Sequence, residues 1–343
     1  MTNFHHVDPS LPSLYRAVIL FGLNTASYKF SLGKSLIELA DADAEFVPIE
    51  TLARYFSKHV ADHVADAPKQ STRKTQVGYF ETCRRFNLGE IDEGELVHQT
   101  VKNAFDDVID RFHIVNREEL DRRFYIDERK ASPSGIRLTD DLYRLVKEAR
   151  GAELMPEIEA RWRLVETAWE LNISRSLITV QHDVELEKLF VENFLRRRNV
   201  TSTREALNGY QRGKCFFCYD RISVISGLPD IAHVDHFFPH VLKRHGMGSI
   251  LDGVWNLVLA CKSCNGIQEK GAKVPHTDLL ERLHKRNEYL IDSNHPLKET
   301  LIHQTGRKKA QRIGFLQNKY DVAKDALAAS HPWKPVIKGD PKF

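Results

Sequence analysis

Four of the five cysteines fall into two C-x-x-C pairs, Cys215 with Cys218 and Cys261 with Cys264, and 42 residues separate the pairs. A C-x-x-C turn points two thiolates at one centre, and two such turns complete the closed tetrahedral shell typical of structural zinc. A redox dithiol and an iron–sulfur cluster are the alternatives for this pattern. Cys83 stands alone and is interpreted as a small buried side chain. We therefore predict a structural Zn²⁺ on the two pairs.

A second group of residues suited to chemistry lies between and directly after these pairs. The stretch HVDHFFPH, residues 233–240, contains adjacent Asp235 and His236, and Asn256 and Asn265 follow in WNL and CKSCN. A neutral imidazole titrates near working pH, so His236 can accept a proton from water. On a strand, Asp235 would point to the face opposite His236 unless the backbone bends.

The order D-H-x-x-P, then N-L, then C-x-x-C-N, framed by cysteine pairs, resembles the zinc-containing branch of the HNH, or ββα-metal, nuclease superfamily. The resemblance covers about 60 residues, under a fifth of the chain. The remaining chain resembles, more loosely, longer bacterial HNH proteins of antiviral or mobile-element contexts. The resemblance implies a metal-dependent DNA endonuclease or nickase that hydrolyses phosphodiester bonds.

The resemblance also assigns roles to the matching residues. His236 would be the general base on the first strand of a short hairpin, facing the scissile phosphate. Asp235 would bind the catalytic metal with Asn265, which would open the family's helix at a position that is histidine in many relatives. These oxygen ligands favour Mg²⁺, with Mn²⁺ as a substitute. Asn256 would be structural, because its amide would tie the active-site loop together and hold His236 in register.

Two other readings stay open. The chain could be a catalytically silent, zinc-stapled adaptor that binds nucleic acid within a multi-protein system. It could also be an effector of bacterial antiviral defence whose N-terminal domain docks on a partner protein. Three further histidines, His233, His240 and His245, could assist the metal or contact phosphate, or could be structural or solvent-exposed.

The elements that position these residues are predicted from hydrophobic periodicity. Residues 1–195 read mainly as helices, because apolar residues recur at spacings of three and four. Between Phe124 and Leu145, Pro133 and Gly135 supply turn chemistry, which favours a short hairpin leading into a helix. The apolar stripes are Leu52, Tyr55, Phe56, His59 and Val60; Val101, Phe105, Val108, Ile109 and Phe112; and Ile158, Trp162, Val165 and Trp169.

The chain as a whole is predicted to be α+β and to have three parts. Residues 1–195 would be a mainly helical N-terminal domain with one short hairpin and no assigned ligand. Residues 196–276 would be the ββα-metal module with its zinc knuckles, beginning with a helix that ends near Gly209 to Gly213. Residues 277–343 would form a helical, basic C-terminal extension, and Pro332, Pro335 and Pro341 would mark a frayed end.

Composition and charge favour a soluble protein that contacts nucleic acid near this module. The 42% hydrophobic and 28% charged residues are ordinary for globular proteins, and no secretory signal or membrane span is recognisable, so we expect a cytoplasmic location. Residues 196–214 carry six basic and one acidic residue, and residues 282–319 nine and three. Such segments suit phosphate contacts, although solvated helix faces are the alternative. The candidate DNA contacts are Arg196, Arg197, Arg198, Arg212, Lys214, Lys262, Lys270, Arg307, Lys308 and Lys309.

Overall fold

A computed structural model describes most of the chain as two compact units, Met1–Asn172 and Ile173–Phe343. The mixture of helices and small sheets confirms the α+β class. The described residues are 10–21, 26–42, 44–72, 78–115, 118–147, 151–170, 180–183, 188–193, 196–292, 297–328, 331–341 and 343, and the side chains of 180–183, 188–193 and 196–202 lie outside the description.

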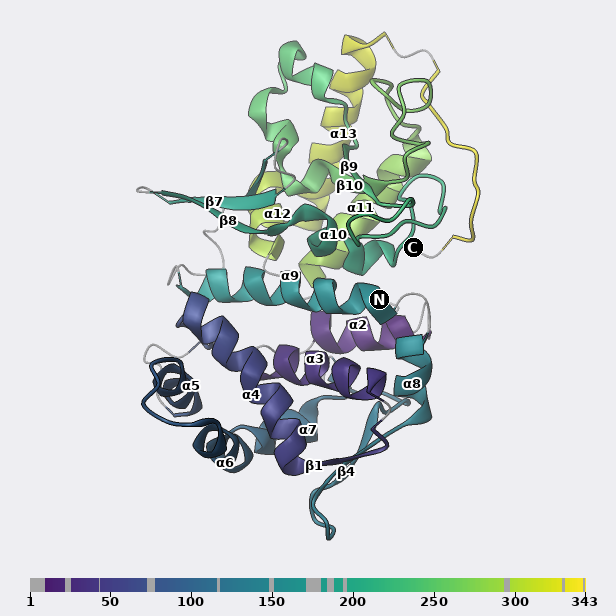
Figure 1. The fold of residues 1–343 in the computed structure, drawn as a ribbon. Coiled ribbons are helices and arrows are strands. Elements are labelled where there is room, and N and C mark those ends of the chain that lie inside the picture. The colour runs from purple at the N-terminus through teal and green to yellow at the C-terminus, as the bar shows by residue number, and fades with distance from the viewer. Residues whose placement is uncertain are drawn as a thin grey trace. The chain divides into compact units, whose positions relative to one another are not determined.

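The first unit is mainly helical (Figure 1). Its predicted apolar stripes lie on helices whose buried faces form the core, and burial of each large apolar side chain contributes about 1.5–3 kcal/mol. The stripe from Val101 to Phe112 crosses a break at Ala104, so two helices carry it instead of one. The helices are α2 (Leu11–Phe21), α3 (Tyr28–Asp41), α4 (Ile49–Asp66), α5 (Tyr79–Asn87), α6 (Glu93–Asn103), α7 (Phe105–Arg111), α8 (Asp140–Lys147) and α9 (Gly151–Glu170).

The predicted hairpin of the first unit is present and belongs to a larger sheet. Strands β4 (Tyr125–Glu128) and β5 (Gly135–Leu138) pair antiparallel, and α8 follows directly. Strand β1 (Phe46–Pro48) adds to the other edge of β5, giving the order β1-β5-β4. Two short strands, β2 (Ile114–Val115) and β3 (Glu118–Glu119), form a separate antiparallel pair.

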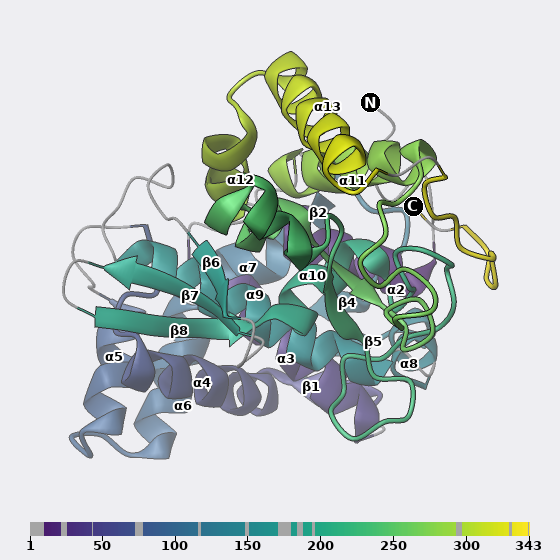
Figure 2. The same ribbon diagram turned by 90° about the horizontal axis from the view of Figure 1, so that it is seen from above.

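The second unit begins earlier than the boundary at residue 195 drawn from the sequence. Strands β6 (Val180–Asp183), β7 (Lys188–Asn193) and β8 (Arg196–Ser202) form an antiparallel sheet within this unit, which Figure 2 shows from above. Residues 196–202 are therefore a strand, and helix α10 (Thr203–Gln211) starts only after it. The helices α11 (Thr277–Asp292), α12 (Leu297–Thr305) and α13 (Lys309–Ala326) belong to the same unit, not to a separate extension.

Between α10 and α11 lie the elements that carry the candidate site. Strands β9 (His233–His236) and β10 (Leu257–Ala260) form an antiparallel hairpin. Three short 3₁₀ helices, η1 (His240–His245), η2 (Gly248–Asp252) and η3 (Val254–Asn256), make up the loop between them. The strands of this ββ hairpin begin and end close to the residues predicted to carry chemistry.

One buried histidine of the first unit makes its folding dependent on pH. The His113 ring is 4% exposed, and its Nε2 accepts a hydrogen bond of 3.0 Å from the backbone N–H of Phe124. Burial, together with the positive charges of Arg123 and Lys29, lowers the pKa of His113 from 6.5 to about 3. The neutral ring is thus the form that the fold requires.

We expect this histidine to destabilise the first unit as the pH falls from about 6.5 toward 3. In that window the unfolded chain binds a proton that the folded one does not, so the free energy of unfolding decreases. The His113→Gln variant keeps an acceptor but cannot titrate, and should lose less stability than the wild type between pH 6.5 and 4 in denaturant unfolding. Parallel losses in the two proteins would contradict the assignment.

Candidate metal centre and hydrolytic site

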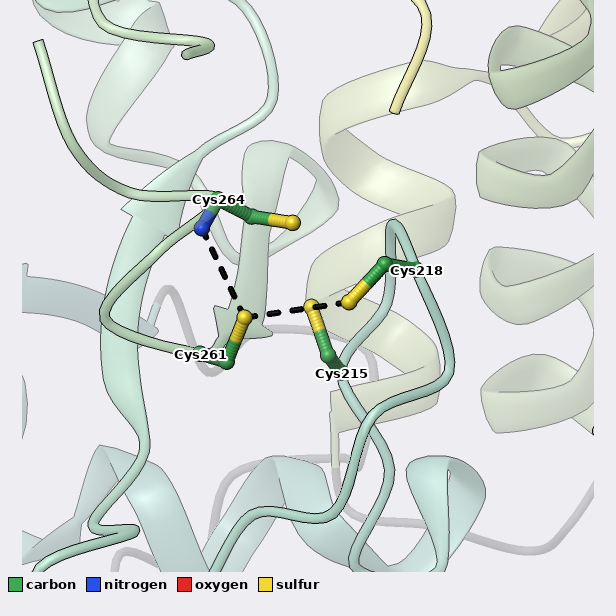
Figure 3. Close-up of side chains that lie close together, drawn as sticks. All are labelled: Cys215, Cys218, Cys261 and Cys264. Atoms are coloured by element: carbon green, nitrogen blue, oxygen red, sulfur yellow. Dashed lines mark hydrogen bonds between the residues drawn. The ribbon is translucent and has the colours of Figure 1, made fainter. Parts of the chain in front are cut away.

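The four paired cysteines converge on one point in the second unit. All four are buried, and their sulfur atoms lie within 4.8 Å of one another (Figure 3). The Sγ atoms of Cys218 and Cys261 are 3.7 Å apart. Ligands of a tetrahedral zinc at Zn–S distances of about 2.3 Å stand about 3.8 Å from each other. The cluster therefore fits a metal ion such as zinc.

The two C-x-x-C segments form tight turns that aim their thiols inward. In the second, the backbone N–H of Cys264 lies 3.5 Å from Cys261 Sγ and donates to it. In the first, Tyr219 N–H donates to Cys215 O, and Tyr219 itself has a left-handed φ of 61°. Backbone donors aimed at sulfur favour the thiolate form that a metal requires.

Hydrogen bonds among the thiols divide their protons unequally. Those from Cys215 and Cys218 hold the pKa of Cys261 well below its ordinary value, whereas bonding to Cys218 raises the pKa of Cys215 and bonding to Cys215 raises the pKa of Cys264. A metal ion binds the thiolate form of cysteine, so its binding should weaken at low pH.

Helix α11 and the C-terminal segment hold the first knuckle in place. Arg282 Nη1 donates to the carbonyls of Phe216 and Phe217 at 2.5 and 2.9 Å, and its guanidinium lies 4.2 Å from the Tyr219 ring centre. The backbone N–H groups of residues 338 and 339 donate to Cys218 O at 2.9 and 3.1 Å. The expectation of a frayed C-terminus is therefore wrong, because this segment is hydrogen-bonded to the first cysteine turn.

The same framework includes the hairpin. The side-chain amide of Gln211, at the end of α10, makes the two hydrogen bonds to β10 that the backbone of a neighbouring strand would make. Its Oε1 accepts from Leu259 N–H and its Nε2 donates to Leu259 O, both at 2.8 Å. The N–H of Phe216 donates to the same carbonyl at 2.9 Å. Because Cys261 directly follows β10, the hairpin and both knuckles are fixed to one another.

Asn256 clamps the loop that follows β9. The side chain is fully buried; its Oδ1 accepts from Phe238 N–H at 2.8 Å, and its Nδ2 donates to the carbonyls of Phe238 and Leu251 at 3.1 and 2.9 Å. Its own carbonyl accepts from Phe237 N–H at 2.7 Å. These bonds fix the backbone that immediately follows His236.

A second layer of contacts from α11 holds the other side of this loop. The guanidinium of Arg286 donates to the carbonyls of Val254 and Trp255, and Asn287 Nδ2 also donates to Trp255 O. Burial lowers the pKa of Arg286 to about 9. The sequence analysis did not single out either residue, since an Arg-Asn pair in a basic amphipathic helix has no distinctive spacing.

His236 stands at the end of β9 beside residues that the sequence analysis did not place with it. Its Nε2 lies 3.3 Å from Asp252 Oδ1, and His240 Nε2 lies 3.4 Å from the same oxygen. The other carboxylate oxygen lies 2.6 Å from Lys243 Nζ. His236 is buried, whereas His240 is exposed. The site thus combines a sheltered imidazole with a nearby carboxylate and an opening to solvent.

Asp235 faces a different partner. Its Oδ1 and Oδ2 lie 3.1 and 3.0 Å from Lys270 Nζ, and the same ammonium donates to His236 O at 2.6 Å. Burial raises the pKa of Asp235, while the charge of Lys270 opposes that rise. The ion pair with Lys270 is the contact that Asp235 Oδ2 makes, since it accepts no other hydrogen bond from the described residues. A divalent cation must share this carboxylate with Lys270 or displace the ammonium.

The helix expected to open at Asn265 is absent from the described structure. Residues 262–272 form consecutive turns, in which Asn265 N–H donates to Cys261 O and Lys270 N–H to Cys264 O. Gly271, with φ of +44°, adopts a conformation that interrupts a right-handed helix. Asn265 is half-buried directly after the cluster, and the described contacts do not join its side chain to Asp235.

The structure changes the set of candidate DNA contacts. Arg212 and Lys270 are 2% and 1% exposed, so their prediction as phosphate contacts is wrong for this structure. Lys270 is instead the partner of Asp235. The side chains of Arg196, Arg197 and Arg198 lie outside the described residues, Lys214 is half-buried, and Lys262, Arg307, Lys308 and Lys309 are exposed.

Comparisons with protein-family models, curated proteins and solved structures find no match to this chain. The site is therefore interpreted from its own geometry. Among the described residues, no helix has both the length and the apolar character needed to cross a bilayer.

We expect one zinc per chain, bound by the cysteine cluster. In Cys261→Ser, metal analysis should find that this zinc is lost. The second unit should also melt at least about 10 °C lower, because loss of the metal should remove several kcal/mol of folding free energy and ~1 kcal/mol corresponds to about 2–4 °C at this size. Cys83→Ser is the matched control: Cys83 is also buried but lies in the other unit, so zinc content should not change. Full zinc retention in Cys261→Ser would contradict the assignment.

The Asn256 clamp predicts a loss of stability without a loss of zinc. Asn256→Ala leaves a buried N–H and two carbonyls without their partner, and should lower the free energy of unfolding by at least about 2 kcal/mol, since each such group costs about 1–3 kcal/mol. The exposed Asn318→Ala should stay within about 0.5 kcal/mol of wild type. Equal unfolding free energies in denaturant titrations of the two variants would refute the clamp.

Proposed function

We propose that this protein is a DNA endonuclease or nickase that hydrolyses phosphodiester bonds at His236. The observation that carries the proposal is the position of this histidine. It is buried at the end of a hairpin strand, the Asn256 clamp fixes the backbone that follows it, and the cysteine cluster anchors the other strand. A general base must be held in place, and imidazole is the side chain whose ordinary pKa suits proton transfer near neutral pH.

His236 would accept a proton from the attacking water. The water oxygen forms a bond to phosphorus and the bond from phosphorus to the 3′ oxygen breaks. The leaving 3′ oxygen takes a proton from solvent, His236 later releases its proton to solvent, and a 5′-phosphate and a 3′-hydroxyl result. The fixed loop would keep the ring in one orientation during this transfer. Correct orientation lowers the activation barrier further than proximity of the ring to the water does by itself. One such site cuts one strand at a time, so cleavage of both strands would need two sites or successive nicks.

A divalent cation such as Mg²⁺ or Mn²⁺, held by Asp235 and Asn265, would supply positive charge for the transition state and the leaving oxygen. This assignment is supported by the carboxylate of Asp235, which precedes His236 on β9 and already lies beside a positive charge, that of Lys270. The Lys270 ammonium is positively charged, as the proposed cation is, and it forms an ion pair with Asp235 when no ion is bound.

The exposed basic residues near the site support nucleic acid as the substrate class. Lys262 lies in the turn of the second knuckle, and Arg307, Lys308 and Lys309 are exposed at the start of α13. Such residues contact phosphates without reading sequence. A role as an effector of antiviral defence, acting with partner proteins, is compatible with this activity and is carried only by the family resemblance.

A second candidate function is favoured by one contact. In the adaptor reading the chain binds nucleic acid and does not cut it, and the ion pair between Lys270 and Asp235 supports this reading. Here the ammonium would permanently replace the catalytic cation. The two candidates differ in whether DNA is cleaved at all.

The test is cleavage of supercoiled plasmid in Mg²⁺ or Mn²⁺. We expect nicked product from the wild type, none with EDTA, and a rate at least about 100-fold lower for His236→Ala, since general bases contribute about 10²–10⁴-fold. His245→Ala, which removes an exposed histidine of η1, should cut like the wild type. A wild type that binds DNA but never cuts it, with either metal, would support the adaptor instead.

A further inference from the structure

The proposed base, His236, belongs to a further group of side chains that could bind a metal ion. The ligand atoms of His236, His240 and Asp252 all lie within 4.8 Å of one another. They come from β9, η1 and η2, which the hairpin loop brings together. Neither Asp235 nor Asn265 belongs to this group, so it is distinct from the Mg²⁺ ligands proposed above.

The distances from each histidine to the aspartate match those between ligands of one ion. The Nε2 atoms of the two histidines lie 3.3 and 3.4 Å from Asp252 Oδ1. Ligands of a tetrahedral ion bound at about 2.0–2.1 Å stand about 3.3–3.4 Å apart. Both nitrogens thus contact the same carboxylate oxygen, so the three ligand atoms surround a common point.

The chemistry of the group selects the class of ion. Two imidazole nitrogens and one carboxylate suit Zn²⁺ and similar transition metals, whereas Mg²⁺ prefers oxygen ligands. Three protein ligands also leave one position open for water. The His240 side chain is 51% exposed, which gives an ion access from solvent.

Lys243 adjusts the charge of this group. Its Nζ lies 2.6 Å from Asp252 Oδ2, the carboxylate oxygen that faces away from the histidines. This contact orients the carboxylate so that Oδ1 faces the two imidazoles. It also neutralises much of the carboxylate charge, so the ion would bind less tightly than one in the cysteine cluster.

We propose that His236, His240 and Asp252 form a second, weaker binding site for Zn²⁺, and that zinc bound there inhibits hydrolysis. A coordinate bond uses the single in-plane lone pair of a neutral imidazole. The ring then has no nitrogen left to accept a proton from water, so His236 becomes a ligand and ceases to be a base. Zinc binding is independent of the proposed function, whereas inhibition rests on it.

The binding test uses the full chain with its cysteine cluster already loaded with one zinc. Calorimetric titration with Zn²⁺ should show one further ion per wild-type chain, and His240→Ala and Asp252→Asn should each bind it at least about 10-fold more weakly. His245→Ala, the neighbouring exposed histidine outside the group, should bind it like the wild type. No further ion in the wild type, or one that both ligand variants bind equally well, would overturn the proposal.

The inhibition test compares plasmid cleavage in Mg²⁺ with and without added Zn²⁺ for each protein. At zinc concentrations that fill the second site, the wild type should cut at least about 10-fold more slowly with Zn²⁺ than without it. His240→Ala should cut at nearly the same rate with and without Zn²⁺ at the same concentrations. Undiminished wild-type cleavage with the second site filled would overturn the inhibitory role. If no protein cuts DNA, the proposed nuclease function fails, while the binding result still decides the second site.

Discussion

The cysteine cluster is the constraint on which the second unit depends. Its four thiols come from two turns 42 residues apart, so one bound ion closes the long loop that contains β9 and the three short helices. The turns are tied to α11 through Arg282 and to the C-terminal segment through Cys218 O. Such a site contributes folding free energy directly, which a small, irregular region needs because it has little regular secondary structure.

The hydrolytic site follows from this anchoring. Strand β10 leads into the second cysteine pair, and its pairing with β9 places His236 opposite Leu257. Asn256 then joins the two ends of the loop through buried hydrogen bonds. The proposed base is therefore held by the cysteine cluster, the short β9–β10 ladder and the Asn256 amide, and none of these groups takes part in the proposed reaction.

Local spacing explains what the sequence could predict. The C-x-x-C pairs, the hairpin of the first unit and its helical stripes depend on residues close together in the chain, so the sequence alone predicts them. The sequence does not predict the contact of His236 with Asp252 or that of Asp235 with Lys270, because irregular turns bring these residues together. The helix expected at Asn265 failed for a similar reason: the chain around Gly271 turns instead of continuing a helix.

The most direct test of this account is a crystal structure of the His236→Ala variant with a DNA duplex and Mg²⁺. The account predicts a phosphate at the end of β9, facing position 236, with the cation between that phosphate and Asp235 and with Lys270 displaced from the carboxylate. DNA bound on another surface, with position 236 far from any phosphate and the pair between Lys270 and Asp235 intact, would contradict it.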